Sequence, residues 1–186
     1  MKIALLGTRG IPAAYGGFET FAEILSTRLA AVGMDVTVFC TREAIPQPES
    51  YNDVTLEYAA SPSCGPFSTI VYDLVCLWRA RKDFDVVYML GYGASLFCFL
   101  PRLWGTRVWI NMDGIEWARS KWSWPARLWL RTMESVALWT ANVIIADADA
   151  IGDYLRRRHR KVPGLQVIPY GAEVVQHPPD TAPLAN

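Results

Sequence analysis

Residues 2–32 read KIALLGTRGIPAAYGGFETFAEILSTRLAAV and decide the fold of this chain. The stretch opens with the apolar run Lys2–Gly7, which is typical of a strand covered on both faces. It then passes through a loop that ends in Gly16 and Gly17 and enters a helical pattern. One face of the expected helix carries Phe18, Phe21, Ala22, Leu25 and Leu29. We therefore predict a strand, a glycine-containing loop and a helix, the opening unit of a parallel sheet.

The same alternation continues along the chain. Six more apolar runs are predicted strands: Asp35–Cys40, Val54–Tyr58, Asp85–Leu90, Arg107–Met112, Asn142–Ala146 and Leu165–Pro169. The predicted helices are Gly17–Val32, Phe67–Lys82, Ala94–Leu103, Pro125–Ala141 and Asp147–Arg158. This order favours an α/β fold, a doubly wound, Rossmann-like parallel sheet of about seven strands over residues 1–175. Residues 41–53 are expected to be a loop, and residues 176–186 a tail or the start of an interdomain linker.

Composition excludes several classes of protein. Of the 186 residues 52% are hydrophobic, and 18 basic side chains balance 18 acidic ones. A chain with zero formal net charge has no overall field that attracts nucleic acid, so we expect no nucleic-acid partner. The longest uncharged run, Val86–Pro101, has 16 residues and falls short of the roughly 20 that cross a bilayer, so we expect no membrane-spanning segment and, from the short apolar run at the start, no secretory signal.

The cysteines argue against metal and disulfides. Cys40, Cys64, Cys76 and Cys98 are scattered, without a C-x-x-C pair, and only two histidines could assist them. Neither a zinc site nor a disulfide framework is indicated. We expect reduced thiols in a cytoplasmic protein that needs no metal.

The glycine pair is a candidate anion site. Gly16 and Gly17 follow the first strand and open the first helix, where free N–H groups favour phosphate. Neither G-x-G-x-x-G nor a P-loop is present. The alternative is a simple tight turn, but the position between strand and helix favours an anion site.

A pair of carboxylates follows the strand Arg107–Met112. Asp113 and Glu116 are the best acid/base candidates, because ligands of open parallel sheets bind at the carboxyl ends of the strands. Equally, Asp113 could cap a turn and Glu116 be solvated.

Residues 117–139 combine tryptophan with positive charge. This window holds five of the eight tryptophans and four Lys/Arg against one Glu. Such a composition is typical of a surface that rests on anionic lipid headgroups, and we predict a peripheral membrane contact. The alternative is that the rings pack the helix against the sheet.

Three segments resemble a known family. GTRGIPAAYGGFETFAEILSTRLA at 7–30, NMDGIEWARSKW at 111–122, and NVIIADADAIGDYL at 142–155 with VIPYGAE at 167–173 resemble the N-terminal domain of bacterial GT-B glycosyltransferases. The resemblance is strongest to the retaining, rhamnosyltransferase-like group of polysaccharide synthesis. It covers nearly all of residues 1–175.

The resemblance implies roles for single residues. Gly16 and Gly17 would approach the diphosphate of a nucleotide-sugar donor, and Asp113 and Glu116 would serve the transfer. A glycan or a lipid-linked acceptor at the inner face of the plasma membrane would engage a further set of residues. These are Gly114, Trp117, Arg119, Lys121, Trp122, Trp124 and Arg127.

The resemblance also limits what is expected. A diphosphate oxygen would assist the incoming hydroxyl, so neither a cofactor nor a metal is expected for the chemical step. Many relatives have His-Asp where this chain has Met112-Asp113, so a histidine role is not transferred. The C-terminal donor-binding domain would be absent from this sequence, and the chain alone would be inactive.

Two other functions remain open. The chain could be a non-catalytic Rossmann-like module that docks on a membrane or a protein partner. A dinucleotide-dependent oxidoreductase has the same fold class, but the chain lacks G-x-G-x-x-G and has Cys40 where an acidic residue would end the second strand.

Overall fold

A computed structural model describes residues 1–14, 16–42, 47–63 and 65–171. The strands are β1 (Lys2–Leu6), β2 (Asp35–Thr41), β3 (Ser50–Tyr51), β4 (Val54–Ala59), β5 (Val86–Leu90), β6 (Arg107–Met112), β7 (Val143–Ala146) and β8 (Gln166–Val167). The α-helices are α1 (Gly17–Ala31), α2 (Ser68–Arg79), α3 (Phe99–Arg102), α4 (Trp124–Thr140) and α5 (Asp149–Arg158). Three short 3₁₀ helices, η1 (Gly65–Phe67), η2 (Ser95–Cys98) and η3 (Glu116–Ala118), complete the described part of the chain.

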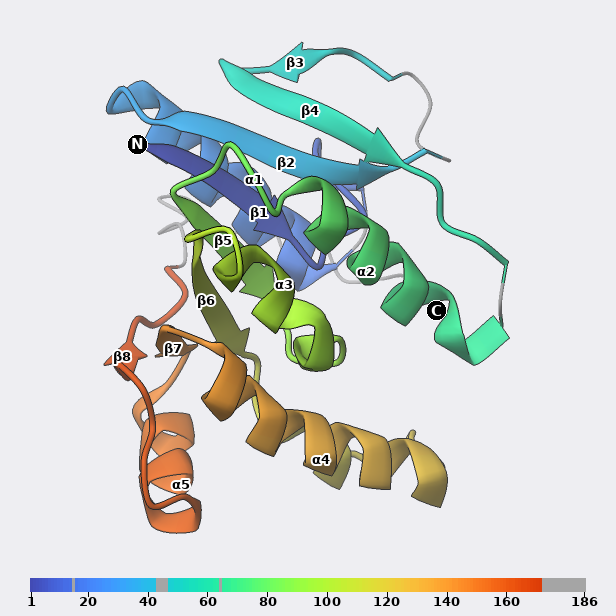
Figure 1. The fold of residues 1–186 in the computed structure, drawn as a ribbon, viewed down its shortest axis with the longest axis vertical. Helices are drawn as coiled ribbons and strands as arrows, with labels where there is room; N and C mark the ends of the chain where they lie inside the picture. Colours follow the sequence, from blue (N-terminus) through green and yellow to red (C-terminus); the bar gives the residue numbers. More distant parts are fainter. Residues whose placement is uncertain (15, 43–46, 64, 172–186) are drawn as a thin grey trace, which may run out of the picture.

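The eight strands form one sheet in the order β3-β4-β2-β1-β5-β6-β7-β8 (Figure 1). Every neighbouring pair is parallel except β3 and β4. All seven predicted strands are present, and the doubly wound α/β fold is confirmed.

Helices cover both faces of the sheet. On one face α1 packs over β1, β2 and β5, with Phe18, Phe21 and Leu25 against the buried strand residues. On the other face α2, η2, α4 and α5 contribute to a second core that includes Leu77, Cys98 and Leu155. The helical periodicity of residues 17–32 therefore identified the packed face of α1.

Two local features differ from the sequence-based expectation. The expected loop over residues 41–53 contains β3, which turns into β4 through Asn52 and Asp53, both at positive φ. Two residues of strand are too few to produce a readable alternation. The expected helix Ala94–Leu103 is divided into η2 and α3, because Pro101 has no N–H to donate to the carbonyl four residues earlier.

Three further expectations concern the cysteines, the C-terminal tail and membrane-spanning helices. Cys40, Cys76 and Cys98 are buried free thiols, whereas Cys64 and the expected tail at 176–186 lie outside the described residues. Among the described helices none has the length and apolar character needed to cross a bilayer.

Candidate functional site

The direction in which the chain adds strands to the sheet reverses between β1 and β5. From β1 the chain runs outward through β2 and β4, then crosses back to β5 and continues to the opposite edge. Gly7 and Gly91 follow the two strands at this switch point, where ligands of open α/β sheets bind. Gly7 has a φ of 88°, and a Cβ there would lie 2.2 Å from the Leu90 carbonyl oxygen. A side chain at Gly7 would therefore push β1 and β5 apart.

The two glycines of the predicted anion site lie at the start of α1. Gly16 precedes the helix at a φ of 94°, and no atom lies within 4 Å of the position that a Cβ of Gly17 would take. Within the described part of the chain, neither backbone N–H donates to a protein acceptor. Both glycines line a cavity of about 580 Å³ together with Thr20 and Tyr170. The amides are thus open to a ligand at a helix N-terminus.

Two carboxylates of α1 hold the preceding loop. Glu19 accepts a hydrogen bond from the Arg9 amide at 3.4 Å, and Glu23 accepts one from the Ala13 amide at 2.6 Å. The other oxygen of Glu23 accepts from the Tyr51 hydroxyl at 2.7 Å. Sequence reasoning did not single out these residues, although an acidic residue in the first turn of a helix is a known stabilising pattern.

Asp113 lies directly after β6, half-buried in a cavity of about 300 Å³. Phe18, Gly91 and Tyr92 line the same cavity. Burial raises the pKa of Asp113 to about 6, and the charges of Asp147 and Glu116 add to the effect. A carboxyl group that titrates near neutral pH is suited to general acid/base chemistry.

Glu116 differs from Asp113 in its partners. Arg119 and Lys121 form ion pairs with its carboxylate, and the Trp122 indole donates to it at 3.1 Å. Burial alone would raise the pKa of Glu116, but these hydrogen bonds and charges outweigh burial and lower it. Glu116 therefore stays ionised and holds two cations at the rim of the Asp113 cavity.

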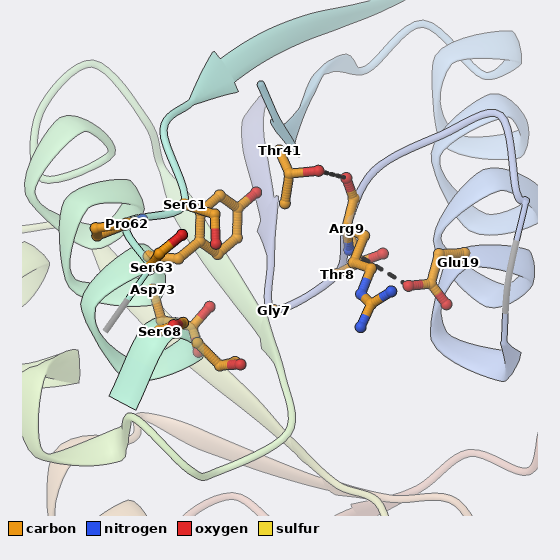
Figure 2. A pocket seen from close by; sticks show the side chains of 12 residues that line it. Gly7, Thr8, Arg9, Glu19, Thr41, Ser61, Pro62, Ser63, Ser68 and Asp73 are labelled. Carbon is orange, nitrogen blue, oxygen red and sulfur yellow. Dashed lines mark hydrogen bonds between the residues drawn. The ribbon is translucent and has the colours of Figure 1, made fainter. Parts of the chain in front are cut away.

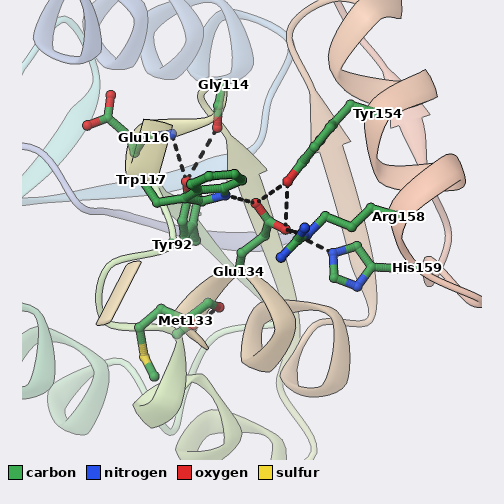
Figure 3. A network of polar contacts seen from close by, with 10 residues as sticks. Tyr92, Gly114, Glu116, Trp117, Met133, Glu134, Tyr154, Arg158 and His159 are labelled. Carbon is green, nitrogen blue, oxygen red and sulfur yellow. Dashed lines mark hydrogen bonds and ion pairs between the residues drawn. The ribbon is translucent and has the colours of Figure 1, made fainter. Parts of the chain in front are cut away.

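The loop that carries Asp113 and Glu116 is fixed from below by Tyr92 and Glu134 (Figure 3). The buried Tyr92 hydroxyl accepts from the Glu116 amide at 2.9 Å and donates to the Gly114 carbonyl at 3.5 Å. At the residue after Glu116, the Trp117 indole donates to Glu134 at 2.8 Å. The φ of Gly114, 83°, provides the turn between strand and loop.

Glu134 is 1% exposed and accepts further hydrogen bonds from side chains of α5 and of His159, the residue that follows α5. Arg158 Nε lies 2.8 Å and His159 Nε2 2.9 Å from its Oε1, and the Tyr154 hydroxyl donates at about 3.1 Å. The carboxylate thus joins α4, α5 and the Asp113 loop. Its position in an amphipathic helix gave no sequence signal of this role.

Four of the five tryptophans of residues 117–139 form two groups, and the fifth, Trp122, is 36% exposed and donates to Glu116. Trp117 and Trp129 point inward and donate to Glu134 and the Gly93 carbonyl. Trp124 and Trp139 are 76% and 75% exposed on α4. Arg127 is exposed beside Trp124 and lies outside the Asp113 cavity, whereas Arg119 and Lys121 line it. The alternative of packing against the rest of the domain is therefore confirmed for Trp117 and Trp129, whereas Trp124 and Trp139 face solvent.

No group of three or more His, Cys, Asp or Glu side chains in the described ranges is arranged to hold a metal ion.

Comparison with solved structures shows the fold family. Sucrose-phosphate synthase from Thermosynechococcus elongatus superposes with a TM-score of 0.72 at 18% identity, over 92% of this chain and 48% of that one. A shorter form of the same synthase gives 0.61 at 16% identity, covering 92% and 90%. UGT2 from Phytolacca americana, complexed with UDP-2-fluoro-glucose and pterostilbene, gives 0.55 at 8% identity, covering 88% and 52%. This chain spans about half the length of the full synthase.

Sequence comparison identifies the family itself. No curated protein sequence matches the chain. A family profile described as a domain of unknown function, DUF1972, matches residues 1–173. The chain therefore belongs to the DUF1972 family and has the Rossmann-like fold of GT-B glycosyltransferase domains.

Proposed function

We propose that this chain is the acceptor-side domain of a retaining GT-B glycosyltransferase. It transfers a sugar, rhamnose in the form that we favour, from a nucleotide-diphosphate sugar to a glycan or lipid-linked acceptor in polysaccharide synthesis. The observation that carries the proposal is the adjacency of two groups. Phe18, the residue after Gly17, lines the cavity that contains Asp113. A donor diphosphate at the glycine amides would therefore lie beside a carboxyl group suited to the acceptor hydroxyl.

Each residue has a chemical role in this proposal. The N–H groups of Gly16 and Gly17 stabilise the negative charge that develops on the leaving diphosphate. Asp113 accepts a hydrogen bond from the acceptor hydroxyl and orients it, while a diphosphate oxygen takes the proton. Glu116 acts indirectly, because it positions Arg119 and Lys121 at the rim of the cavity. No metal takes part in the chemical step.

A second Rossmann-like lobe would complete the donor site. In this arrangement residues 1–175 form the acceptor-side domain, and the base and ribose of the donor bind chiefly to the other lobe. Rhamnose and the retaining outcome rest on the sequence resemblance at residues 7–30 and 111–122.

The test uses the protein that includes both proposed lobes. It measures the release of nucleoside diphosphate from the nucleotide sugar in the presence of acceptor. Asp113→Asn is expected to lower turnover by about tenfold, because a hydrogen bond to a charged acceptor contributes about 1.5–3 kcal/mol and one to a neutral acceptor about 0.5–1.5 kcal/mol. Asp153→Asn, at an exposed acidic residue of α5, is the control and should leave turnover unchanged. Activity should survive a metal chelator. Equal rates for Asp113→Asn and the unaltered protein would exclude the proposed role.

The pH profile provides an independent check. Because an ionised Asp113 carboxylate accepts a stronger hydrogen bond than the protonated carboxyl group, turnover should rise with pH through about 6 and then level off. In Asp113→Asn this rise should disappear. A rise at the same pH in the variant would assign it to another group.

A membrane contact at α4 is the second part of the proposal. Trp124, Leu128 and Trp139 are exposed and lie on one side of the helix, with Arg127 and Arg131 alongside. Indole rings and cations together favour the headgroup region of anionic bilayers. We place the cytoplasmic protein at the inner face of the plasma membrane for this reason.

Sedimentation with phosphatidylserine-containing vesicles tests the contact. Binding should be salt-sensitive and should fall several-fold in Trp124→Ser combined with Trp139→Ser. Trp78→Ser, at an exposed tryptophan of α2, is the matched control. Strong binding together with no nucleotide-sugar turnover in the protein that includes both lobes would favour the non-catalytic docking module instead.

A further inference from the structure

A third cavity lies beside the switch point, where residues of β2 and α2 and the segments that follow β1 and β4 line it (Figure 2). Its volume is about 520 Å³, within the range of small-molecule sites. The loop after β1, the end of β2, the segment after β4 and the first turns of α2 all line it. Sequence reasoning did not identify this cavity.

Asp73 is the unusual group in its wall. The residue is 4% exposed on α2, and its Oδ1 is buried without a hydrogen-bond partner among the described residues. Burial raises the pKa of Asp73 to about 8, so the carboxyl group is neutral at neutral pH. A buried polar atom without a partner costs about 1–3 kcal/mol, so an occupant of the cavity that pairs with it would gain the lost contact.

The rest of the wall is rich in hydroxyl groups. Thr8, Thr41, Ser61, Ser63 and Thr69 contribute them from four separate segments of the chain. Arg9 is the only cationic side chain among the described residues of the wall, and Glu19 opposes it with a carboxylate. Hydroxyl and carboxyl groups pair with ligand hydroxyls, whereas a phosphate is bound by cations or by free backbone N–H groups.

We propose that this cavity binds a neutral polyol of the size of a pyranose ring, with a ligand hydroxyl donating a hydrogen bond to Asp73 Oδ1. The apolar part of the ring lies against Tyr72, which lines the same cavity. The site is separate from the Gly16–Gly17 amides and from Asp113, so it does not depend on the proposed transfer reaction.

Protein-detected NMR titration of the chain with L-rhamnose and with D-glucose tests the proposal. Saturable shifts are expected at the amides of Gly7, Thr69 and Asp73. Asp73→Leu should raise the dissociation constant by about tenfold or more, the loss expected for one hydrogen bond at a buried group. Asp73→Asn keeps an oxygen acceptor and should stay within about threefold of the unaltered protein.

A second variant does not touch the buried residue. Ser63→Trp, at an exposed wall position, should fill the mouth of the cavity and abolish the shifts, whereas Ser135→Trp on α4 should not. Absence of saturable shifts with both sugars would overturn the proposal, as would sugar binding by Asp73→Leu or by Ser63→Trp that is as tight as in the unaltered protein. Saturable binding of inorganic phosphate in place of the sugars would overturn it as well.

Discussion

Glu134 and Asp73 are buried carboxyl groups in the same core layer of the sheet, and their surroundings are opposite. Glu134 has four side-chain donors, from Trp117, Tyr154, Arg158 and His159. Asp73 has an oxygen without a partner among the described residues and lines a cavity. Burial of a carboxyl group is thus used here in two ways. A fully paired group fixes helices and a loop, whereas an unpaired one is available to a ligand.

Substitution of each carboxyl group by leucine should give the largest difference in the free energy of unfolding between the two positions. Glu134→Leu leaves the Arg158 charge and three other donors unpaired, and we expect the free energy of unfolding to fall by about 3–5 kcal/mol. Asp73→Leu breaks no bond in the described structure and should be neutral or stabilising. Urea denaturation of the two variants measures both values. Equal losses would show that the two carboxyl groups are not distinct.

Two arginines of α5 sharpen the comparison within one helix. Arg158 pairs with the buried Glu134, whereas Arg156 pairs with Asp153, and both partners of that second pair are more than half exposed. Arg158→Met should cost about 1.5–3 kcal/mol, the value of a hydrogen bond to a charged group, while Arg156→Met should cost less than about 0.5 kcal/mol. Thermal or urea unfolding distinguishes them. A larger loss for Arg156→Met would contradict the assignment of Glu134 as the fixed centre.

The pH dependence of stability should reveal Asp73. In the folded state this group keeps its proton up to a pH of about 8, while in the unfolded chain it loses the proton near pH 4. Between these values the unfolded state binds fewer protons, so the free energy of unfolding should fall as pH rises and level off above 8. The contribution is at most about 1.4 kcal/mol for each pH unit.

Asp73→Asn removes this contribution while keeping the shape of the side chain. The free energy of unfolding of Asp73→Asn minus that of the unaltered protein should therefore increase as pH rises from 4 to 8. A constant difference would mean that Asp73 is ionised in the folded protein.

Much of the fold could be predicted from the sequence because strands covered on both faces read as continuous apolar runs. The run VVYML of β5 and the apolar face of α1 are clear examples. The short strand β3 could not be predicted, since two residues carry no periodicity. The positions of Asp113 after β6 and of Gly16–Gly17 at the start of α1 could be predicted, because the carboxyl ends of parallel strands are defined by the chain order.

The remaining part of the site depends on tertiary packing. Asp73 lies in an apolar stretch of α2, three and four residues before the buried Cys76 and Leu77, which was the one available signal. Nothing in the spacing of α4 distinguishes the buried Glu134 from a solvated acidic residue. The tryptophans of α4 were similarly ambiguous, because composition does not tell which ring meets solvent and which meets the core.

The most direct test of the account is NMR titration of the chain with uridine, thymidine and guanosine diphosphates. With at least one of them, the largest shifts are expected at the Gly16 and Gly17 amides. Gly17→Val should weaken this binding by about tenfold or more while leaving the free energy of unfolding nearly unchanged, because its Cβ meets no atom within 4 Å. Saturable binding that leaves both glycine amides unshifted, or that survives Gly17→Val, would contradict the central claim that the start of α1 binds the diphosphate.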